Sequence, residues 1–562
     1  MWIATVVQAA LLLAQLQIPR PVPPAEVEVE RDVAPAKHFL LSGVVQDSVT
    51  GQGVPRAVVV LQEYGRGEQG PGSRQTTTGE DGRFQFTNVK SGGADIRIHR
   101  LGYGSGYSYI EPDRVGDLSG LTVKLEPLAA ISGRVVDDQD QALPGIAVQA
   151  VRLSTVQGVR QSAIEAGFKT DDRGEFRLWH LRPGRYLLRA IGRKQTGFYV
   201  GYVEPFRSRE SYGPAYYPDG DSADTATVFR LKPGEELAAG FKLTGRQAYN
   251  VSGRIAGVDR SAPLNATLLK PGGDEAGATF RVNVETGAFT LTDVAPGDYT
   301  IVITESTARQ GRTAMAEVRV RDRDVTGAVM EMSAAQDMTF QLVEEGLAAE
   351  GRQAGVTLLL IPQTTSSNQW ARPITVFLRP GTAEVKQVVG PGRYVVKANF
   401  FGGYVESVMA GETDLLSAGL VVMAGVAPAP VKVKVVRGGG KISIKLPDGA
   451  RTEEERSRAT QSMLQARLQT QSGMEAMDAQ SKLIIAPAQG AWTPAEFIIG
   501  MTQMLEAKPF APGEYLVFPL SDQEAEYHDK SKIAADLSKA KRFRVTEGQT
   551  TEVELDLEGE KR

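Results

Sequence analysis

Short runs of alternating apolar and polar residues, separated by tight turns, dominate the chain. Thr170–Ala190 shows the pattern most clearly, with Phe176 and Leu178 on one face of a predicted strand, since successive side chains of a strand point to opposite sides. Pro183-Gly184 then suits the two central positions of a type II turn, and the alternation resumes beyond it. The stretch therefore predicts a β-hairpin.

Similar sequence motifs recur at intervals of roughly 100 residues, which is the size of a β-sandwich domain. A Ser-Gly opening occurs three times, in Leu41–Asp47, Ile131–Asp137 and Val251–Gly257. The closing Pro-Gly-x-Tyr turn occurs four times, starting at Pro183, Pro296, Pro391 and Pro512, and Ser91-Gly92-Gly93 replaces it in the first repeat. Such a long period excludes a solenoid, so each repeat should bury its own core.

We therefore expect an all-β chain built as a tandem array of about five β-sandwich modules. The expected modules span 39–127, 128–246, 247–332, 333–426 and 427–562, after a signal peptide at 1–17 and a proline-rich linker at 18–38. Phe198–Gly220 is an aromatic, turn-rich insert in the second module. Thr452–Lys482 and Asp522–Lys541 are rich in helix formers, which predicts short helical inserts in the last module.

The beginning of the chain indicates export. Trp2–Leu16 is an apolar run that is too short to span a bilayer comfortably and fits the hydrophobic part of a signal peptide, although no basic residue precedes it. No later stretch is apolar enough for a transmembrane helix. We expect a periplasmic or extracellular protein. The chain has no cysteine, which excludes disulfides and thiolate metal sites, and a net charge of −4 with scattered basic residues argues against nucleic acid as a partner.

These phrases resemble the carboxypeptidase regulatory-like domain, over roughly Phe39–Met332. The resemblance rests on the Ser-Gly opening, the Thr-x-x-x-Gly-x-Phe hairpin at Thr78 and Thr170, and the Pro-Gly-x-Tyr turn. It implies a seven-stranded, prealbumin-like or Ig-like sandwich. Tyr216-Tyr217-Pro218 and the following Leu231–Glu235 resemble long multi-module proteins of the acidobacterial type. Such modules accompany peptidases, receptors and sugar-binding proteins, so the resemblance implies a fold and not an activity.

The sequence offers no catalytic constellation, and we expect no enzyme, cofactor or metal. A zinc peptidase needs a His-x-x-Glu pair, and none of the four histidines, His38, His99, His180 and His528, is followed by Glu at that spacing. Gly438–Lys441 lacks the hydroxyl that a phosphate-binding loop requires. Asp219–Asp224 resembles part of a calcium loop, but its spacing favours a solvated acidic turn.

Tyrosines in the second-module insert are the best candidates for ligand binding. Exposed rings on loops can stack on sugars, and loops on a rigid sandwich commonly carry recognition. The candidates are Tyr199, Tyr202, Tyr212, Tyr216 and Tyr217. The competing and favoured interpretation is that these rings hold the insert against its own sandwich.

Two functions remain open at this stage. The preferred hypothesis is an exported, non-enzymatic array that acts as a structural or interaction module at the cell envelope, with an envelope protein or a polysaccharide as partner. The alternative is a carbohydrate-binding protein that recognises polysaccharide through the loop tyrosines. Exposed, coplanar rings would favour the alternative.

Overall fold

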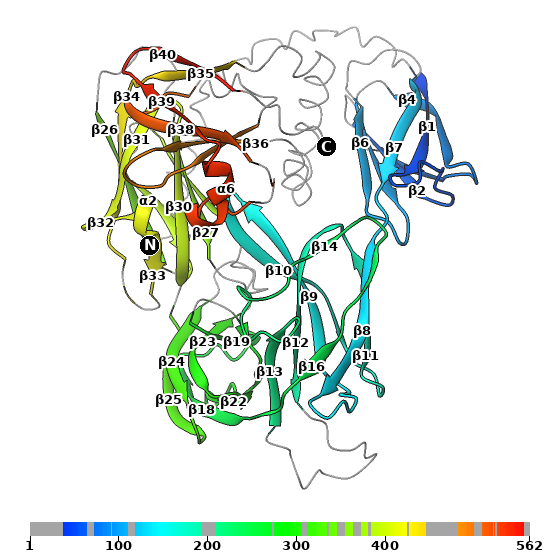
Figure 1. Ribbon diagram of the computed structural model, residues 1–562, viewed down its shortest axis with the longest axis vertical. Coiled ribbons are helices and arrows are strands. Elements are labelled where there is room, and N and C mark those ends of the chain that lie inside the picture. The colour runs from blue at the N-terminus through cyan, green and yellow to red at the C-terminus, as the bar shows by residue number, and fades with distance from the viewer. Residues whose placement is uncertain are drawn as a thin grey trace, which may run out of the picture.

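The computed structural model describes residues 38–64, 72–90, 93–110, 118–193, 210–271, 275–305, 312–333, 336–345, 355–363, 373–379, 384–423, 426, 428–445, 482–498, 508–520, 522 and 525–555. These residues form ten β-sheets that pair into five sandwiches in chain order. The fold is all-β, as the alternation predicts. In Figure 1 the first sandwich lies at the upper right, the second below it and the third at the lower left, while the last two lie at the upper left, near the end of the β9–β10 hairpin of the second. The predicted signal peptide, and the predicted linker up to residue 37, lie outside the described residues.

The first sandwich pairs the sheet β4-β1-β7 with the sheet β3-β2-β5-β6. Its opening strand lies in the middle of the smaller sheet, antiparallel to β4 and parallel to the last strand, β7. The strands are β1 (His38–Asp47), β2 (Val58–Glu63), β3 (Gly72–Thr77), β4 (Arg83–Lys90), β5 (Ala94–His99), β6 (Gly106–Ile110) and β7 (Leu118–Leu125).

The second sandwich repeats this topology with a larger sheet. Its opening strand β8 lies between β11 and two short parallel strands, and the sheet β10-β9-β12-β13-β17, with β14 on β12, packs against it. The strands are β8 (Ala129–Asp137), β9 (Ala147–Val156), β10 (Val159–Lys169), β11 (Glu175–Leu181), β12 (Gly184–Arg193), β13 (Glu210–Tyr216), β14 (Phe229–Leu231), β15 (Glu236–Ala238), β16 (Phe241–Leu243) and β17 (Arg246–Gln247).

The third sandwich pairs the sheet β21-β22-β18-β25 with the sheet β20-β19-β23-β24. Its opening strand again has an antiparallel neighbour and a parallel, closing neighbour. The strands are β18 (Tyr249–Ala256), β19 (Leu264–Leu269), β20 (Glu275–Ala276), β21 (Thr279–Val282), β22 (Ala288–Val294), β23 (Gly297–Glu305), β24 (Thr313–Val320) and β25 (Val325–Glu331).

The fourth sandwich pairs the sheet β29-β26-β34-β31-β32 with the sheet β28-β27-β30-β33. Its last strand, β34, pairs in parallel with β26 and so belongs here, although it lies beyond residue 426, where we expected this module to end. The elements are β26 (Gln336–Glu345), β27 (Val356–Pro362), β28 (Ile374–Leu378), β29 (Val385–Val389), β30 (Gly392–Phe400), β31 (Gly403–Ala410), β32 (Thr413–Asp414), the one-turn helix α2 (Leu415–Ala418), β33 (Leu420–Val422) and β34 (Val431–Arg437).

The fifth sandwich is the smallest in the described part of the chain, with the parallel pair β35-β40 against the sheet β37-β36-β38-β39. The helical pattern in Asp522–Lys541 appears as two short turns, η4 and α6. Of the helix predicted over Thr452–Lys482, residues 452–481 lie outside the described residues, and Lys482 begins the strand β36. The elements are β35 (Lys441–Lys445), β36 (Lys482–Pro487), β37 (Ala495–Ile498), β38 (Gly513–Pro519), η4 (Lys530–Ile533), α6 (Ala534–Leu537), β39 (Lys541–Val545) and β40 (Thr550–Glu554).

The glycine of each Ser-Gly opening is required by the closing strand. A Cβ atom at this position would overlap a backbone carbonyl oxygen of the crossing chain, which approaches where only glycine leaves room. The glycine and the residue that provides the carbonyl are Gly43 and Leu121, Gly133 and Ala239, and Gly253 and Ala328. The recurring Ser-Gly therefore marks the place where each of the first three sandwiches closes.

The tyrosine of each Pro-Gly-x-Tyr turn stabilises its own turn. In four sandwiches a buried tyrosine hydroxyl donates a hydrogen bond to the backbone carbonyl four residues earlier, much as in the tyrosine corner of immunoglobulin folds. The bonds run from Tyr186 to Arg182 (2.8 Å), Tyr299 to Ala295 (2.9 Å), Tyr394 to Gly390 (2.8 Å) and Tyr515 to Ala511 (3.0 Å). Burial raises the pKa of Tyr394 and of Tyr515 to about 12, so these hydroxyls keep the proton that they donate.

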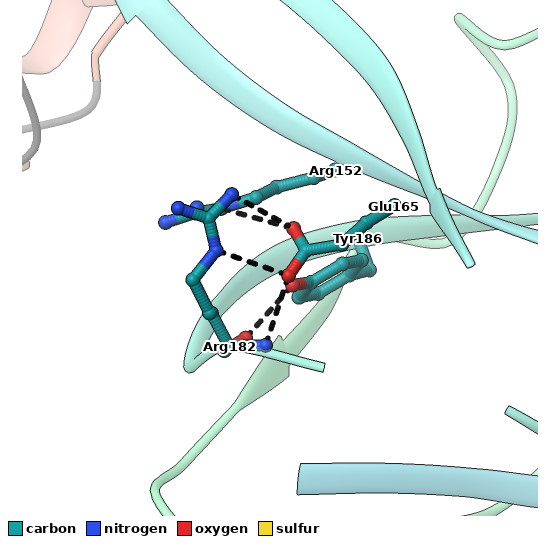
Figure 2. Close-up of polar contacts among 4 residues, drawn as sticks. All are labelled: Arg152, Glu165, Arg182 and Tyr186. Carbon is teal, nitrogen blue, oxygen red and sulfur yellow. Dashed lines mark hydrogen bonds and ion pairs between the residues drawn. The ribbon is translucent and has the colours of Figure 1, made fainter. Parts of the chain in front are cut away.

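In the second sandwich the same turn is also braced by charge. Figure 2 shows the carboxylate of Glu165, on β10, against the turn that contains Arg182. Glu165 accepts from the backbone N–H and from the Nε of Arg182, at 3.0 and 3.1 Å, while Nε of Arg152 lies 3.8 Å away. The cluster joins β9, β10 and the turn before β12, which stiffens the sheet that extends toward the last two sandwiches.

The described helices are short, and none of them has the length and apolar character needed to cross a membrane.

We expect Gly253→Ala to destabilise the third sandwich by about 1–3 kcal/mol, the usual cost of forcing atoms into a packed space. The added methyl group would displace the backbone of β25 at Ala328. Amide hydrogen exchange should become faster in β18, β22 and β25. Gly104→Ala is a matched control, because its Cβ would lie 3.7 Å from the nearest neighbouring atom, an ordinary contact. Equal exchange in both variants would contradict the conclusion that the closing strand requires glycine in the Ser-Gly opening.

Candidate binding site and module junction

The tyrosines of the second-module insert do not form an exposed platform. Tyr212 and Tyr216 are only 2% and 3% exposed. Tyr217 is half-buried, with its ring 5.0 Å from that of Phe229 and 5.8 Å from that of Phe241. Tyr199 and Tyr202 lie outside the described residues. The three described rings pack the insert onto its own sandwich, because large rings gain most from leaving water, and they do not offer the exposed, coplanar surface that the carbohydrate-binding alternative requires.

One of these tyrosines does border a cleft. A cleft of about 320 Å³ lies between the second and third sandwiches, lined on one side by Tyr212, Asp219 and Asp221 and on the other by Tyr299. The exposed guanidinium of Arg246 also faces it. The cleft offers hydrogen-bonding groups of both charges to a polar ligand.

The acidic turn in this cleft does not have the environment of a calcium site. Asp219 and Asp221 are exposed, and the ammonium of Lys270 donates to the backbone carbonyl of Asp221 at 2.6 Å. A positive charge bonded to the turn repels a cation. Within the described ranges no three His, Asp or Glu side chains gather in a metal-binding group.

The described structure contains a second assembly of functional side chains, at a junction that the sequence did not predict. The hairpin β9–β10 of the second sandwich projects against the fourth and fifth sandwiches, as Figure 1 shows near β27 and α6. Its turn residues Gln157 and Gly158 both have positive φ, 48° and 75°, which is typical of a tight two-residue hairpin. The turn thus presents its flanking valines to the neighbouring sandwich.

Apolar and polar contacts hold this hairpin in place. Val159 packs with Ile361 and Val395 of the fourth sandwich, and all three are at most 5% exposed. The amide of Gln161 donates to the carbonyl of Pro362 at 3.1 Å. Residues 201 positions apart in the sequence are therefore in direct contact.

The fifth sandwich closes over the turn. The backbone N–H of His528 donates to the carbonyl of Gly158 at 3.2 Å, and a Cβ on Gly158 would lie 2.6 Å from ring carbons of Tyr527. Glycine is needed at this turn both for its positive φ and for the close approach of the ring. Tyr527, which is 1% exposed, donates its hydroxyl proton to Glu496 at 2.7 Å.

A buried lysine joins the fourth and fifth sandwiches at the same place. The ammonium of Lys397, on β30, lies 3.4 Å from the carbonyl of Pro494 and 5.9 Å from the ring centroid of Tyr527. Burial lowers the pKa of Lys397 to about 8. Burial, and next the charge of Lys397, lower the pKa of His528 to about 4, and Nδ1 of this histidine has no hydrogen-bond partner among the described residues. The junction therefore holds His528 neutral.

The remaining histidines stand apart from this junction. His38 begins β1, His99 ends β5 with its ring 3.1 Å from the Ser105 hydroxyl, and His180 lies on β11. The structure does not bring the four histidines together.

Comparison with known proteins agrees with the repeat pattern. The family model described as the carboxypeptidase regulatory-like domain matches residues 41–126 and 130–206. The first two sandwiches are carboxypeptidase regulatory-like domains. No curated protein matches the chain.

Several solved structures are similar in fold. They include the minor pilin GBS52 of Streptococcus agalactiae (13% identity, 37% of this chain and 96% of that chain, TM-score 0.22), a streptococcal ancillary pilin (11%, 53% and 99%, 0.17) and the TIE protein of Bacillus anthracis (12%, 72% and 74%, 0.15). Identities and scores this low carry no argument about function.

Sequence reasoning missed the junction, although two signals for it are present. The β9–β10 hairpin of the second regulatory-like domain has strands of 10 and 11 residues, whereas the equivalent β2 and β3 of the first have six each. Val156 and Val159 flank its turn, where a solvated hairpin would have polar residues. A long hairpin with an apolar tip predicts that the tip is covered.

We expect the junction to weaken as the pH falls from about 6.5 to about 4. Once separated from the fifth sandwich, His528 would take up a proton near its ordinary pKa of 6.5, whereas the docked side chain resists protonation until about pH 4. The undocked state therefore binds more protons than the docked state, so acid favours undocking. Small-angle X-ray scattering should show expansion over this window.

His528→Gln cannot take up this proton, so the variant should lose the expansion between these two pH values. Expansion of the same size in the variant would show that another group controls docking.

Proposed function

We propose that the chain is an exported, non-enzymatic protein that acts as a structural or interaction module at the cell envelope. The observation that carries the proposal is the junction, where the β9–β10 hairpin is clamped by the fourth sandwich at Pro362 and by the fifth at His528, 201 and 370 residues farther along the chain. A flexible chain of domains would need no such contact, since neighbouring domains joined by linkers move freely unless an apolar interface holds them. A clamped array presents its loops at fixed distances, which suits a scaffold.

The charged groups at the junction support a structural role. Lys397 is directed at a carbonyl and a ring, Glu496 accepts from Tyr527, and these groups are enclosed where the sandwiches meet. Enclosing a lysine in this way costs stability unless its partners are placed well. The arrangement favours holding the sandwiches over acting on a small substrate.

Export is proposed from the N-terminal sequence. Trp2–Leu16 has the apolar character of a signal peptide, and a chain without cysteine needs no reducing environment. An envelope protein and a polysaccharide are the two classes of partner. Binding of a polysaccharide through the tyrosines of the insert is less favoured, because Tyr212 and Tyr216 are buried.

Cell fractionation of the tagged full chain tests the location directly. We expect the protein in the envelope or the medium, shortened at its N-terminus. Retention in the cytoplasm at full length would contradict export. Hydrolysis of a peptide or glycan substrate that is abolished by one point substitution would contradict the non-enzymatic assignment.

We expect Val159→Asp to open the array without unfolding its sandwiches. A carboxylate at this 5% exposed position, between apolar side chains, would have no partner to compensate its burial. The variant should show a larger radius of gyration at neutral pH and should capture less envelope partner after cross-linking in cells. Val329→Asp is the matched control, because Val329 is 78% exposed on the third sandwich. Equal partner capture by both variants would show that partner binding does not depend on the clamped arrangement.

A further inference from the structure

An exposed pair of aromatic rings lies on the second sandwich, away from the insert. Phe168 and Trp179 are 46% and 43% exposed, with ring centroids 6.4 Å apart and ring planes inclined by 35°. The ring of His180 lies 4.0 Å from that of Trp179. Single exposed apolar residues are normal, but two large rings side by side form a continuous apolar surface.

Trp179 lies on the outward face of β11, directly before His180, in a bulge that recurs in the chain. His180 has a positive φ of 63°, and the pairing of β11 with β8 shifts register between Leu178 and Leu181. Asn88 and Asp293 have the same conformation at the equivalent places in the first and third sandwiches. The extra residue leaves both Trp179 and His180 on the outside and returns Leu181 to the core.

Only the second of these three repeats carries an aromatic residue at the position before the residue with positive φ. Where this repeat has Trp179, the first has Thr87 and the third has Thr292. Phe168 likewise replaces Thr76 of the first sandwich, because Phe168 pairs with Val148 as Thr76 pairs with Val59. The fold therefore accepts threonine at both positions, and the two rings are not needed to form it.

A groove of polar side chains lies farther back along the same strand, β11. Glu175, Arg177 and Trp179 alternate on the outward face of β11, so Arg177 lies roughly 7 Å along the strand from Trp179. Arg177 lines a shallow groove of about 550 Å³ together with Glu175, Arg134 and Asp171. Two arginines and two carboxylates leave the groove without net charge.

Neighbouring groups hold these polar side chains in place. Arg177 pairs with Glu236 at 3.0 Å, and Nε of Arg134 donates to the carbonyl of Arg173 at 2.8 Å. The carboxylate of Asp171 accepts from the backbone N–H of Glu175 at 2.7 Å. Donors and acceptors are thus arranged along the groove before any ligand arrives.

We propose that this surface of the second sandwich binds a neutral polysaccharide chain. The C–H face of a sugar ring packs on an aromatic face, and its hydroxyls both donate and accept hydrogen bonds, as the arginines and carboxylates of the groove require. A groove without net charge does not select a polyanion or a polycation. This inference does not depend on the scaffold role or on the tyrosines of the insert.

The repeats supply the test substitutions. Trp179→Thr introduces the residue that the first and third repeats have at this position, and Phe168→Thr introduces the residue that the first repeat has. We expect the full chain to bind at least one of a set of soluble neutral glucans, mannans, galactans and xylans saturably in isothermal titration calorimetry. Trp179→Thr should weaken that binding roughly tenfold, the effect of losing one well-packed aromatic contact, and the double variant should abolish it.

Phe377→Thr serves as the matched control, because Phe377 is 48% exposed on the fourth sandwich and lies outside the groove. It should bind as the unchanged protein does. Absence of saturable binding to every neutral polysaccharide would overturn the proposal, and so would equal binding by the double variant. Binding confined to charged polymers or to protein would also overturn it. None of these results would affect the Val159→Asp test, so the two proposals fail separately.

Discussion

Close approach of two parallel backbones is the constraint on which the first three sandwiches depend. Where the closing strand crosses the opening strand, its carbonyl occupies the space of a side chain, and only Gly43, Gly133 and Gly253 make that possible. The closing strand completes the sheet beside the opening strand, so the ends of each repeat meet within one sandwich. Each repeat can therefore bury its own core, and the chain extends by adding whole sandwiches.

A second constraint comes from the way in which these sandwiches pack on one another. A hairpin that extends beyond its own core exposes apolar side chains, and Val156 and Val159 are covered only when the fourth and fifth sandwiches fold back. Covering them brings Lys397 and His528 into an enclosed space, where burial opposes their charged forms. The apolar contact thus favours docking, while the titratable groups make it sensitive to proton concentration.

Short sequence motifs predicted the strands and turns well, because a turn or an alternating strand is determined by nearby residues. The two strands around Pro183-Gly184 and the all-β architecture are confirmed, but the predicted β-hairpin is wrong, because β11 and β12 lie in different sheets and the chain crosses between them at this turn. The place of β34 was not predicted, since its pairing with β26 joins residues about 90 positions apart. Nor did the alternation of residues decide whether the rings of the insert are exposed. Tyr216 lies in the aromatic insert, but it pairs with Arg189 of β12 and is buried. Trp179 was not among the candidates, although it lies on the outward face of β11 with Glu175 and Arg177.

The central claim is that the second and fifth sandwiches are held together, and a distance between them tests it most directly. Arg230 and Asp522 form an ion pair of 3.2 Å across this contact and are 65% and 41% exposed, so replacing both with spin-labelled cysteines should cost little stability. The chain has no cysteine of its own, which makes the labels unique. Double electron–electron resonance should give one short, narrow distance distribution at neutral pH. A long and broad distribution would show that the sandwiches are strung out independently and would contradict the account.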